Sequence, residues 1–305
     1  MRRFFLGAML ATVLATSVAG EPRLNRMIET LDNCSPVFGT FARFRDADGG
    51  AYYGGTELDF VLFDMEHGPT DVNQLRTFLL GMIDRGRQLK KGNLQLDVTP
   101  IVRVPANGIE KNQWMIKQAL DAGSFGVMTP HIANVDEARH AVVSTRYPQA
   151  SGVADFEPAG ERGVAPGYAA RYWGLSVPDY MAKADIWPLD RAGELALLVI
   201  IEDRDGVNNV REILAKVPGI SAIFIGPFDL STSLGVPAQP NHPLTEQAVQ
   251  KVLAACKEYD VPCGILANKA NVEKRLKEGF RLLVLFGSPG EIEDSLRLGK
   301  TAAGR

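Results

Sequence analysis

The sequence predicts an α/β protein built as one (β/α)₈ TIM barrel. Short runs of aliphatic and β-branched residues recur along the chain, separated by segments with a helical pattern. There are eight such runs, and their continuous apolar character is typical of parallel strands that are buried on both faces. No glycine-rich phosphate-binding motif follows the first run, which favours a closed barrel over an open dinucleotide-binding sheet.

Each expected strand is short and stops where polar or small residues begin. The chain has 305 residues, and a barrel of this kind takes roughly 250 residues and folds as one unit. Residues 20–305 are therefore expected to form a single catalytic domain. In chain order, the strands are expected at Val37–Phe41, Phe60–Met65, Pro100–Val104, Phe125–Pro130, Leu195–Ile201, Ala222–Ile225, Cys263–Ala267 and Leu282–Phe286.

The segments between the strands repeat their apolar residues at helical spacing. Val72, Leu75 and Phe78, for example, lie on one face of a helix that is expected at Asp71–Arg85. Further helices are expected at Glu110–Ala122, Val135–Thr145 with Asn134 as its cap, Val207–Val217, Thr245–Tyr259 and Asn271–Glu278.

One long insertion interrupts this alternation. From Pro148 to about Asp190 the chain is rich in glycine, proline and aromatic residues and reads as a long loop. A loop of this length inside a compact domain is usually functional. The insertion is therefore expected to shape a substrate site, with contacts from Arg162, Tyr168, Tyr172 and Trp173.

The first nineteen residues have the pattern of a secretory signal peptide. Arg2 and Arg3 precede a short apolar run from Phe4 to Val18, and small residues lead up to Ala19. The run is shorter than the roughly 20 apolar residues of a membrane-spanning helix. Cleavage after Ala19 would export the protein without a stable membrane association. An uncleaved anchor and an ordinary N-terminal helix of a cytoplasmic protein are the alternatives.

Charge and cysteine content narrow the class of protein. The net charge is −3, from 33 basic and 36 acidic residues, and no basic stripe indicates a nucleic-acid partner. The three cysteines, Cys34, Cys256 and Cys263, form neither a disulfide framework nor a metal-binding spacing. The chain therefore has the composition of an ordinary globular protein, and its cysteines do not decide the compartment.

Two carboxylates follow neighbouring apolar strands. Glu202 ends the fifth expected strand and Asp229 follows the sixth, and strand ends of a barrel meet at one mouth. Two acids in a poorly hydrated site repel each other unless they are protonated or bind a cation. Oxygen ligands of this kind suit Mg²⁺ or Mn²⁺. The alternative is that each acid caps the helix that follows it.

His67 is a candidate general base, since it follows a strand that carries two acids. Asp64 or Glu66 would hold its ring in one tautomer and leave the other nitrogen free to take a proton. A loop histidine satisfied by the backbone is the alternative. His131, after the fourth strand, is a weaker candidate of the same kind.

Arg103 stands at the end of an apolar strand, where an unpaired guanidinium would be costly. It must face a carboxylate, and the planar guanidinium binds a small carboxylate with two hydrogen bonds. That carboxylate belongs either to the substrate or, in an internal ion pair, to Asp64 or Glu66.

Several segments, in one order along the chain, resemble the HpcH/HpaI aldolase/citrate lyase family. The resemblance extends from about Phe38 to Leu296 and is closest to the pyruvate-dependent class II aldolases of 4-hydroxy-2-oxo-heptanedioate and of 2-keto-3-deoxy sugar acids. The segments that carry it are Asp64–His67, Pro100–Arg103, Thr129–Arg139, Arg162-Gly163, Glu202 and Gly226–Ser231.

The resemblance implies a carbon–carbon lyase that makes or cleaves 4-hydroxy-2-oxo acids through a metal-stabilised pyruvate enolate. A divalent metal (Mg²⁺, Mn²⁺ or Co²⁺) would be the cofactor, a 2-keto acid and an aldehyde the small partners, and a homo-oligomer, a hexamer in many members, the assembly. The implied roles are metal ligands for Glu202 and Asp229, general base for His67, its acidic neighbour for Asp64, an acid that raises the basicity of that histidine for Asp121, enolate stabilisation for Arg103, and substrate binding for Arg103, Gly226 and Phe228.

Two departures from the family pattern concern the substrate. Ile200 stands where the family has a substrate-binding glutamine, and Phe228 stands where it has a small residue. An aliphatic side chain cannot replace the hydrogen bonds of an amide, so substrate placement is expected to differ. The alternatives are a lyase of the same family that acts on a CoA thioester or another 2-keto acid, and an exported keto-acid-binding barrel without turnover.

Overall fold

A computed structural model describes residues 22–150 and 157–305 of the chain. The predicted signal peptide at residues 1–19 lies outside the described residues and stays a prediction. No helix within the described ranges is both long and apolar enough to cross a membrane.

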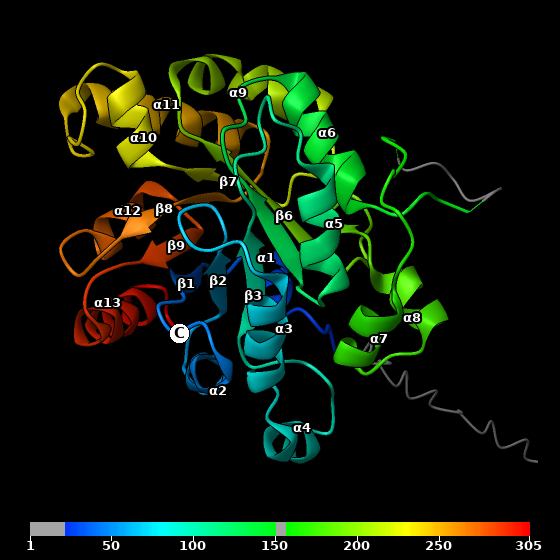
Figure 1. Cartoon of the computed structure of the whole chain (residues 1–305). Coiled ribbons are helices and arrows are strands. Elements are labelled where there is room, and N and C mark those ends of the chain that lie inside the picture. Colours follow the sequence, from blue (N-terminus) through cyan, green and yellow to red (C-terminus); the bar gives the residue numbers. More distant parts are fainter. Residues whose placement is uncertain (1–21, 151–156) are drawn as a thin grey trace, which may run out of the picture.

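Eight parallel strands close into a barrel, with helices between them (Figure 1). The chain runs round the barrel in order, and β4 pairs with β6 to close it, through partners such as Gly126 and Ala196. The ninth strand among the described residues, β5, is a two-residue pairing beside the start of β6. The strands are β1 Val37–Phe41, β2 Phe60–Asp64, β3 Thr99–Arg103, β4 Gly126–Thr129, β5 Ile186–Trp187, β6 Leu195–Ile201, β7 Ala222–Ile225, β8 Cys263–Ala267 and β9 Leu282–Leu285. The predicted TIM barrel is confirmed.

The helices follow local signals in the sequence. Asn134 caps α6 by accepting a hydrogen bond from the Glu137 amide, as its position predicts. The helix expected at Asp71–Arg85 ends earlier, at Gly81. A separate helix begins at Arg85, where Asp84 caps it by accepting from the amide of Arg87. The helices are α1 Arg26–Asp32, α2 Ala47–Gly54, α3 Val72–Gly81, α4 Arg85–Lys91, α5 Gln113–Asp121, α6 Val135–Thr145, α7 Gly167–Trp173, α8 Val177–Lys183, α9 Arg204–Lys216, α10 Pro227–Ser233, α11 Pro243–Glu258, α12 Val272–Glu278 and α13 Pro289–Ala302.

Alternation along the strands decides which polar groups reach the barrel mouth. Ala196, Leu198 and Ile200 of β6 belong to the cluster that fills the barrel interior, so Glu202 continues the same row. By the same alternation, Phe60 and Leu62 precede Asp64 on β2, and Ile101 precedes Arg103 on β3. The polar end of each row therefore lies at the carboxyl ends of the strands, where such barrels carry their active sites.

The opposite end of the barrel is closed by α1, a helix that the sequence analysis did not predict. Met27, Ile28 and Leu31 of this helix pack into the interior cluster. Glu194, just before β6, accepts hydrogen bonds from the backbone amides of Leu24 and Asn25 and holds the helix in place.

The expectation that the insertion is a structureless loop is wrong for its described part, whereas its expected substrate contacts stay a prediction. Residues 157–190 contain α7, α8 and β5. Trp173 stacks on Phe125, with ring centroids 4.2 Å apart, and its indole nitrogen donates to the Gly123 carbonyl. Since Gly123 and Phe125 precede β4, Trp173 packs at the foot of the barrel, away from the mouth of the same chain.

A buried ion pair ties the insertion to α6. The fully buried guanidinium of Arg146 donates to both oxygens of Asp185, at 2.7 Å each, and to the Pro158 carbonyl at 2.8 Å. Arg146→Ala is expected to lower the free energy of unfolding by about 3–5 kcal/mol, because it leaves a largely buried carboxylate without its cation. Denaturant unfolding monitored by circular dichroism measures this loss.

The matched control is Arg211→Ala, which removes an exposed ion pair with Glu258. Exposed pairs contribute about 0–1 kcal/mol, so this variant is expected to unfold nearly as the wild type does. Equal losses for the two variants would contradict a structural role for the Arg146 pair.

Candidate active site

Glu202 is the most deeply buried acid at the barrel mouth. It directly follows β6, and its side chain is 3% exposed. Gly226, after β7, leaves room for it, since a Cβ atom on that glycine would lie 2.4 Å from the Glu202 Oε2 atom. Burial, reinforced by the negative charges of Glu66 and Asp229, raises the pKa of Glu202 to about 7. A carboxylate held in this way is ready to accept a cation.

His131 contacts the Glu202 carboxylate through its backbone and its ring. Its backbone amide donates to Glu202 Oε1 at 2.8 Å, and its ring Nδ1 lies 3.6 Å from the same oxygen. Its Nε2 lies 3.4 Å from Glu66 Oε1. The contact with Glu66, together with the charges of Glu202 and Asp229, raises the pKa of His131 to about 9. The imidazole therefore bridges two acids that come from different strands.

Arg103 is held by an internal ion pair, one of the two readings that the sequence left open. Its Nε and Nη2 donate to the two oxygens of Asp64 at 2.9 and 2.6 Å, and its Nη1 lies 2.9 Å from Glu66 Oε2. The guanidinium also lies over the ring of Phe41, 4.5 Å from its centroid. Although burial would raise the pKa of Asp64, the hydrogen bonds and charge of Arg103 hold it below its ordinary value. Arg103 is therefore positioned as a fixed positive charge at the mouth.

His67 is the exposed histidine of the site. Its side chain is 63% exposed and its Nε2 lies 3.6 Å from Glu66 Oε2. Asp64 shapes the loop that carries it, because Asp64 Oδ1 accepts from the backbone amides of Glu66 and His67. The structure thus places His67 beside Glu66 with its ring exposed. Its role as general base stays a prediction.

Arg45 holds the loop that carries His67 by hydrogen bonds to its backbone. Its Nη2 donates to the carbonyls of Asp64 and Pro69 at 2.6 and 2.9 Å. The loop between these two carbonyls contains Glu66 and His67, so one side chain after β1 holds the position of both.

Asp229 and Phe228 lie in the first turn of α10, which begins directly after Gly226. The Asp229 carboxylate is exposed, and its charge acts on both Glu202 and His131. The Phe228 side chain is 50% exposed. The predicted metal contact of Asp229 and the predicted substrate contacts of Gly226 and Phe228 stay predictions.

The structure does not bring Asp121 to His67 within one chain. Asp121 is the last residue of α5, which runs from the mouth toward the foot of the barrel. There its carboxylate pairs with Arg162 Nη2 at 2.8 Å and with Lys117 Nζ at 3.1 Å. The expected influence of Asp121 on the histidine is therefore not supported by the single chain, since the two ends of a helix lie at opposite ends of a barrel.

Glu66 and His131 are the residues that sequence reasoning undervalued. One donor atom each from Glu66, His131 and Glu202 lies within 4.8 Å of the others, a spacing that fits a divalent ion. The signal for both was their place at a strand end, Glu66 two residues past β2 and His131 two residues past β4. Closure of the barrel determines which polar residues meet across the mouth. A local sequence pattern does not predict these contacts.

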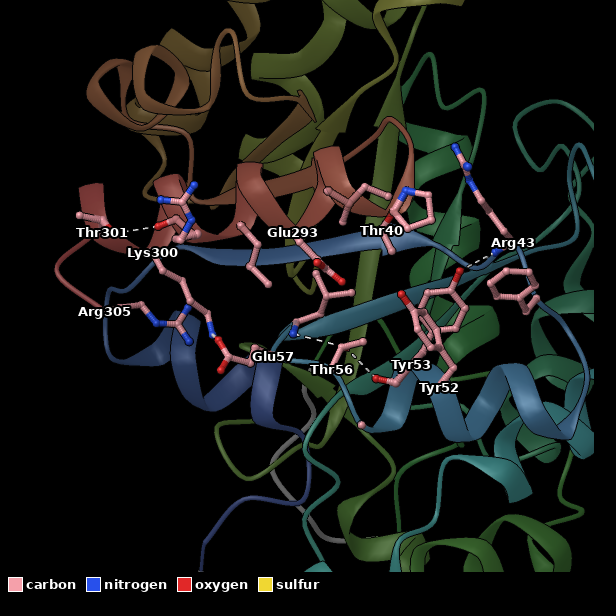
Figure 2. Close-up of a pocket in the computed structure, with 17 residues that line it drawn as sticks. Thr40, Arg43, Tyr52, Tyr53, Thr56, Glu57, Glu293, Lys300, Thr301 and Arg305 are labelled. Atoms are coloured by element: carbon pink, nitrogen blue, oxygen red, sulfur yellow. Dashed lines mark hydrogen bonds and ion pairs between the residues drawn. The ribbon is translucent and has the colours of Figure 1, made fainter.

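A hollow of about 650 Å³ lies between α2 and α13, away from the mouth residues (Figure 2). Tyr52 of α2 and Leu296 of α13 are among its lining residues, and Lys300 lies 3.4 Å from Glu57 across it. Since neither the acids nor the histidines of the mouth line this hollow, the candidate active site remains at the carboxyl ends of the strands.

Comparison with known proteins agrees with this architecture. The family model for HpcH/HpaI aldolase/citrate lyase matches residues 40–291. The chain belongs to this family. A 5-keto-4-deoxy-D-glucarate aldolase of Salmonella paratyphi A is 34% identical over 231 residues, which cover 76% of this chain and 77% of the relative.

Solved structures of family proteins superpose on the barrel. An HpcH/HpaI aldolase/citrate lyase family protein from Burkholderia cenocepacia J2315 has a TM-score of 0.70 and 30% identity, covering 92% of this chain and 97% of its own. An HpcH/HpaI aldolase from Desulfitobacterium hafniense DCB-2 has a TM-score of 0.68, and at 23% identity it speaks for the fold alone. The family and the fold expected from the sequence are both confirmed.

Proposed function

We propose that this protein is a metal-dependent class II aldolase that makes or cleaves 4-hydroxy-2-oxo acids, with pyruvate and an aldehyde as its small-molecule partners. Membership of an aldolase family supports the reaction class. The observation that carries the proposal is the cluster of Glu66, His131 and Glu202 at the barrel mouth, with Arg103 and His67 directly beside it.

The residues at the mouth fit a divalent ion. Glu202 would hold the ion, and Asp229 would supply further negative charge nearby. Burial disfavours the charged form of Glu202 and raises its pKa, and a bound cation would offset the cost of that buried charge. Bound there, the ion would stabilise negative charge on the keto oxygen of pyruvate as a Lewis acid, an effect of several kcal/mol.

The protein's own groups divide the remaining work. In the direction of synthesis, His67 would take a methyl proton of pyruvate at one ring nitrogen, and a proton would go to the aldehyde oxygen as the carbon–carbon bond forms. In the direction of cleavage, His67 would return a proton to the methyl carbon after the carbon–carbon bond has broken. Arg103 would hold a positive charge beside the developing oxyanion, and the two hydrogen bonds to Asp64 fix its plane before the substrate arrives. Glu66 contacts both Arg103 and the His67 ring and so sets their relative position.

Ile200 and Phe228 would shape the substrate preference. Ile200 is buried in the barrel interior and offers only apolar surface where the family has an amide. The half-exposed ring of Phe228 lies in the first turn of α10, beside Asp229 in the chain. We therefore propose that this chain prefers an aldehyde different from those of relatives with glutamine and a small residue at these positions.

Removing the metal is expected to abolish pyruvate enolisation. In D₂O, the wild-type protein should exchange the methyl protons of pyruvate for deuterium when Mg²⁺, Mn²⁺ or Co²⁺ is present, because the base needs a stabilised enolate. Proton NMR of the methyl signal measures the rate, and excess EDTA should reduce it to background until metal is restored.

Exchange that continues in EDTA, in protein shown to be metal-free by mass spectrometry, would contradict the proposed function. Tight pyruvate binding without any exchange would favour the alternative of a keto-acid-binding barrel. A screen of aldehydes with pyruvate then identifies the acceptor by consumption of pyruvate.

A further inference from the structure

The His67 ring is not held in place by packing. Its side chain is 63% exposed, and its Nε2 lies 3.6 Å from Glu66 Oε2, which is farther than a hydrogen bond. The contacts that fix this residue involve the backbone, since its amide and that of Glu66 donate to Asp64 Oδ1 at 3.4 and 3.0 Å. The place of the imidazole at the mouth therefore depends on the shape of the loop that carries it.

Arg45 joins the two ends of this loop. Its Nη2 atom donates to the carbonyl of Asp64, which precedes His67, at 2.6 Å and to the carbonyl of Pro69, which follows it, at 2.9 Å. Because one nitrogen reaches both carbonyls, the chain between them is closed into a small ring that contains His67. Arg45 lies just before Asp46, the cap of α2, so it ties the loop after β1 to the loop after β2.

The guanidinium of Arg45 has a fixed place of its own. Its Cζ lies over the ring of Phe63, 4.4 Å from the centroid, and Phe63 is fully buried on β2. Gly68 leaves room for the guanidinium, because a Cβ atom on that glycine would lie 2.2 Å from Arg45 Nη1. A guanidinium that stacks on a buried aromatic ring keeps its plane, so Arg45 holds the loop from a defined point.

Ion pairing does not explain this arginine. Its hydrogen bonds go to carbonyls, and in the part of the chain that the structure describes its Nε is buried without a hydrogen-bond partner. Burial lowers the pKa of Arg45, although the charges of Asp64 and Asp71 act in the opposite direction. An unsatisfied buried donor costs free energy. The loop that Arg45 holds therefore explains its place better than stability does.

We propose that Arg45 is a positioning residue for proton transfer: by holding the carbonyls of Asp64 and Pro69, it sets the distance between the His67 ring and the carbon that loses its proton. The inference rests on the proposed function, in which His67 is the base. A base must come within about 3 Å of the group that it deprotonates. A misplacement of about 1 Å can slow a reaction about 10²-fold.

The competing explanation is that Arg45 only stabilises the fold of the mouth. The two explanations differ in which steps become slower when the guanidinium is removed. A positioning residue for the base affects the step in which His67 takes a proton. A residue that supports the mouth as a whole affects every step that occurs there, including steps that need no base.

The first test is Arg45→Met, which removes the hydrogen bonds to the loop and keeps an apolar chain near Phe63. Deuterium exchange into the methyl group of pyruvate, with Mn²⁺ or Co²⁺ present, should slow by about 10–100-fold in kcat. The KM for pyruvate should stay within about threefold of the wild-type value, because ground-state binding does not require the base. Proton NMR over a range of pyruvate concentrations measures both parameters.

The second test reaches the enolate without a base. When oxaloacetate loses CO₂, the bond between its methylene carbon and the departing carboxylate breaks. The electron pair of that bond forms the pyruvate enolate, so no proton is removed from carbon, and water can later supply the proton that gives pyruvate. Arg45→Met should therefore release CO₂ from oxaloacetate within about twofold of the wild-type rate, after subtraction of the rate without protein. This activity also shows that the variant folds.

The third test combines Arg45→Met with His67→Ala in one protein. If Arg45 acts through the His67 ring, its removal has no further effect once that ring is gone. The double variant should then exchange within about twofold of His67→Ala alone.

The matched control is Arg23→Met. Arg23 also donates to two backbone carbonyls, those of Gly193 at 3.0 Å and Arg191 at 2.6 Å, but these lie just before β6, at the foot of the barrel. This variant should exchange within about twofold of the wild type, because it loses similar contacts far from the base.

The inference is overturned if Arg45→Met exchanges within about threefold of the wild type. It is also overturned if exchange and CO₂ release fall by the same factor, or if Arg45→Met slows the His67→Ala protein as much as it slows the wild type. The aldolase proposal would survive each of these outcomes. It fails separately, if exchange by the wild-type protein is insensitive to EDTA, and that measurement needs no Arg45 variant.

Discussion

Glu202→Gln is expected to lower the rate of metal-dependent deuterium exchange into pyruvate by about 10³-fold or more. Lewis-acid stabilisation contributes several kcal/mol, and each 1.4 kcal/mol corresponds to a factor of ten in rate. Glutamine keeps the shape of the side chain and removes the negative charge that the ion requires. The rate of methyl exchange at saturating Mn²⁺ or Co²⁺, followed by proton NMR, measures the effect.

Stability distinguishes this loss from unfolding. Because burial already disfavours the charged form of Glu202, the metal-free Glu202→Gln protein should be as stable as the metal-free wild type, or more so. The matched control is Glu212→Gln on α9, which removes an exposed carboxylate paired with Lys216 and should leave exchange unchanged. A Glu202→Gln protein with nearly wild-type exchange would show that the metal, if any, is held elsewhere.

His67→Ala is expected to slow methyl exchange by about 10²–10⁴-fold, the usual contribution of a general base. The loss should fall on kcat, with little change in the KM for pyruvate, because the base acts in the transition state and is not required for ground-state binding. Steady-state exchange rates over a range of pyruvate concentrations separate the two parameters.

The exposure of His67 makes this variant a clean one. With 63% of its side chain exposed, its removal should change the free energy of unfolding by no more than about 0.5 kcal/mol. His140→Ala on α6 removes a histidine outside the mouth and serves as the control. If His67→Ala retains wild-type exchange, the base lies elsewhere, and His131 is the next candidate by position.

The barrel was well predicted because each buried parallel strand appears in the sequence as a short, continuous apolar run. A run such as Leu195–Ile201 is apolar throughout, since one face meets the interior and the other meets the helices, and its bounds agree with β6. The helix ends were harder. The helix expected at Asp71–Arg85 ends at Gly81, and Asp84 caps the next helix. The helix α1 is stabilised by Glu194, a residue about 170 positions away.

The candidate site was predicted in its members and only partly in their partners. Glu202, Arg103 and His67 lie at the barrel mouth, as strand ends require. The sequence left the carboxylate partner of Arg103 open between the substrate and Asp64 or Glu66. The register of β2 and β3, in which Asp64 lies opposite Arg103, decided for the internal ion pair. Asp121 shows the opposite case, since its place at the end of α5 put it beside Arg162 at the foot of the barrel.

Local chemistry was enough to establish the strands, the order of the motifs and the acids and bases that stand at the strand ends, because hydrophobic periodicity and capping act over a few residues. Closure of the barrel decided the rest. It brought His131 between Glu66 and Glu202, although these three residues are far apart in the chain. Contacts across a barrel depend on strand register and backbone conformation, and here they depend on a left-handed turn at His131 that no pattern in the sequence announces.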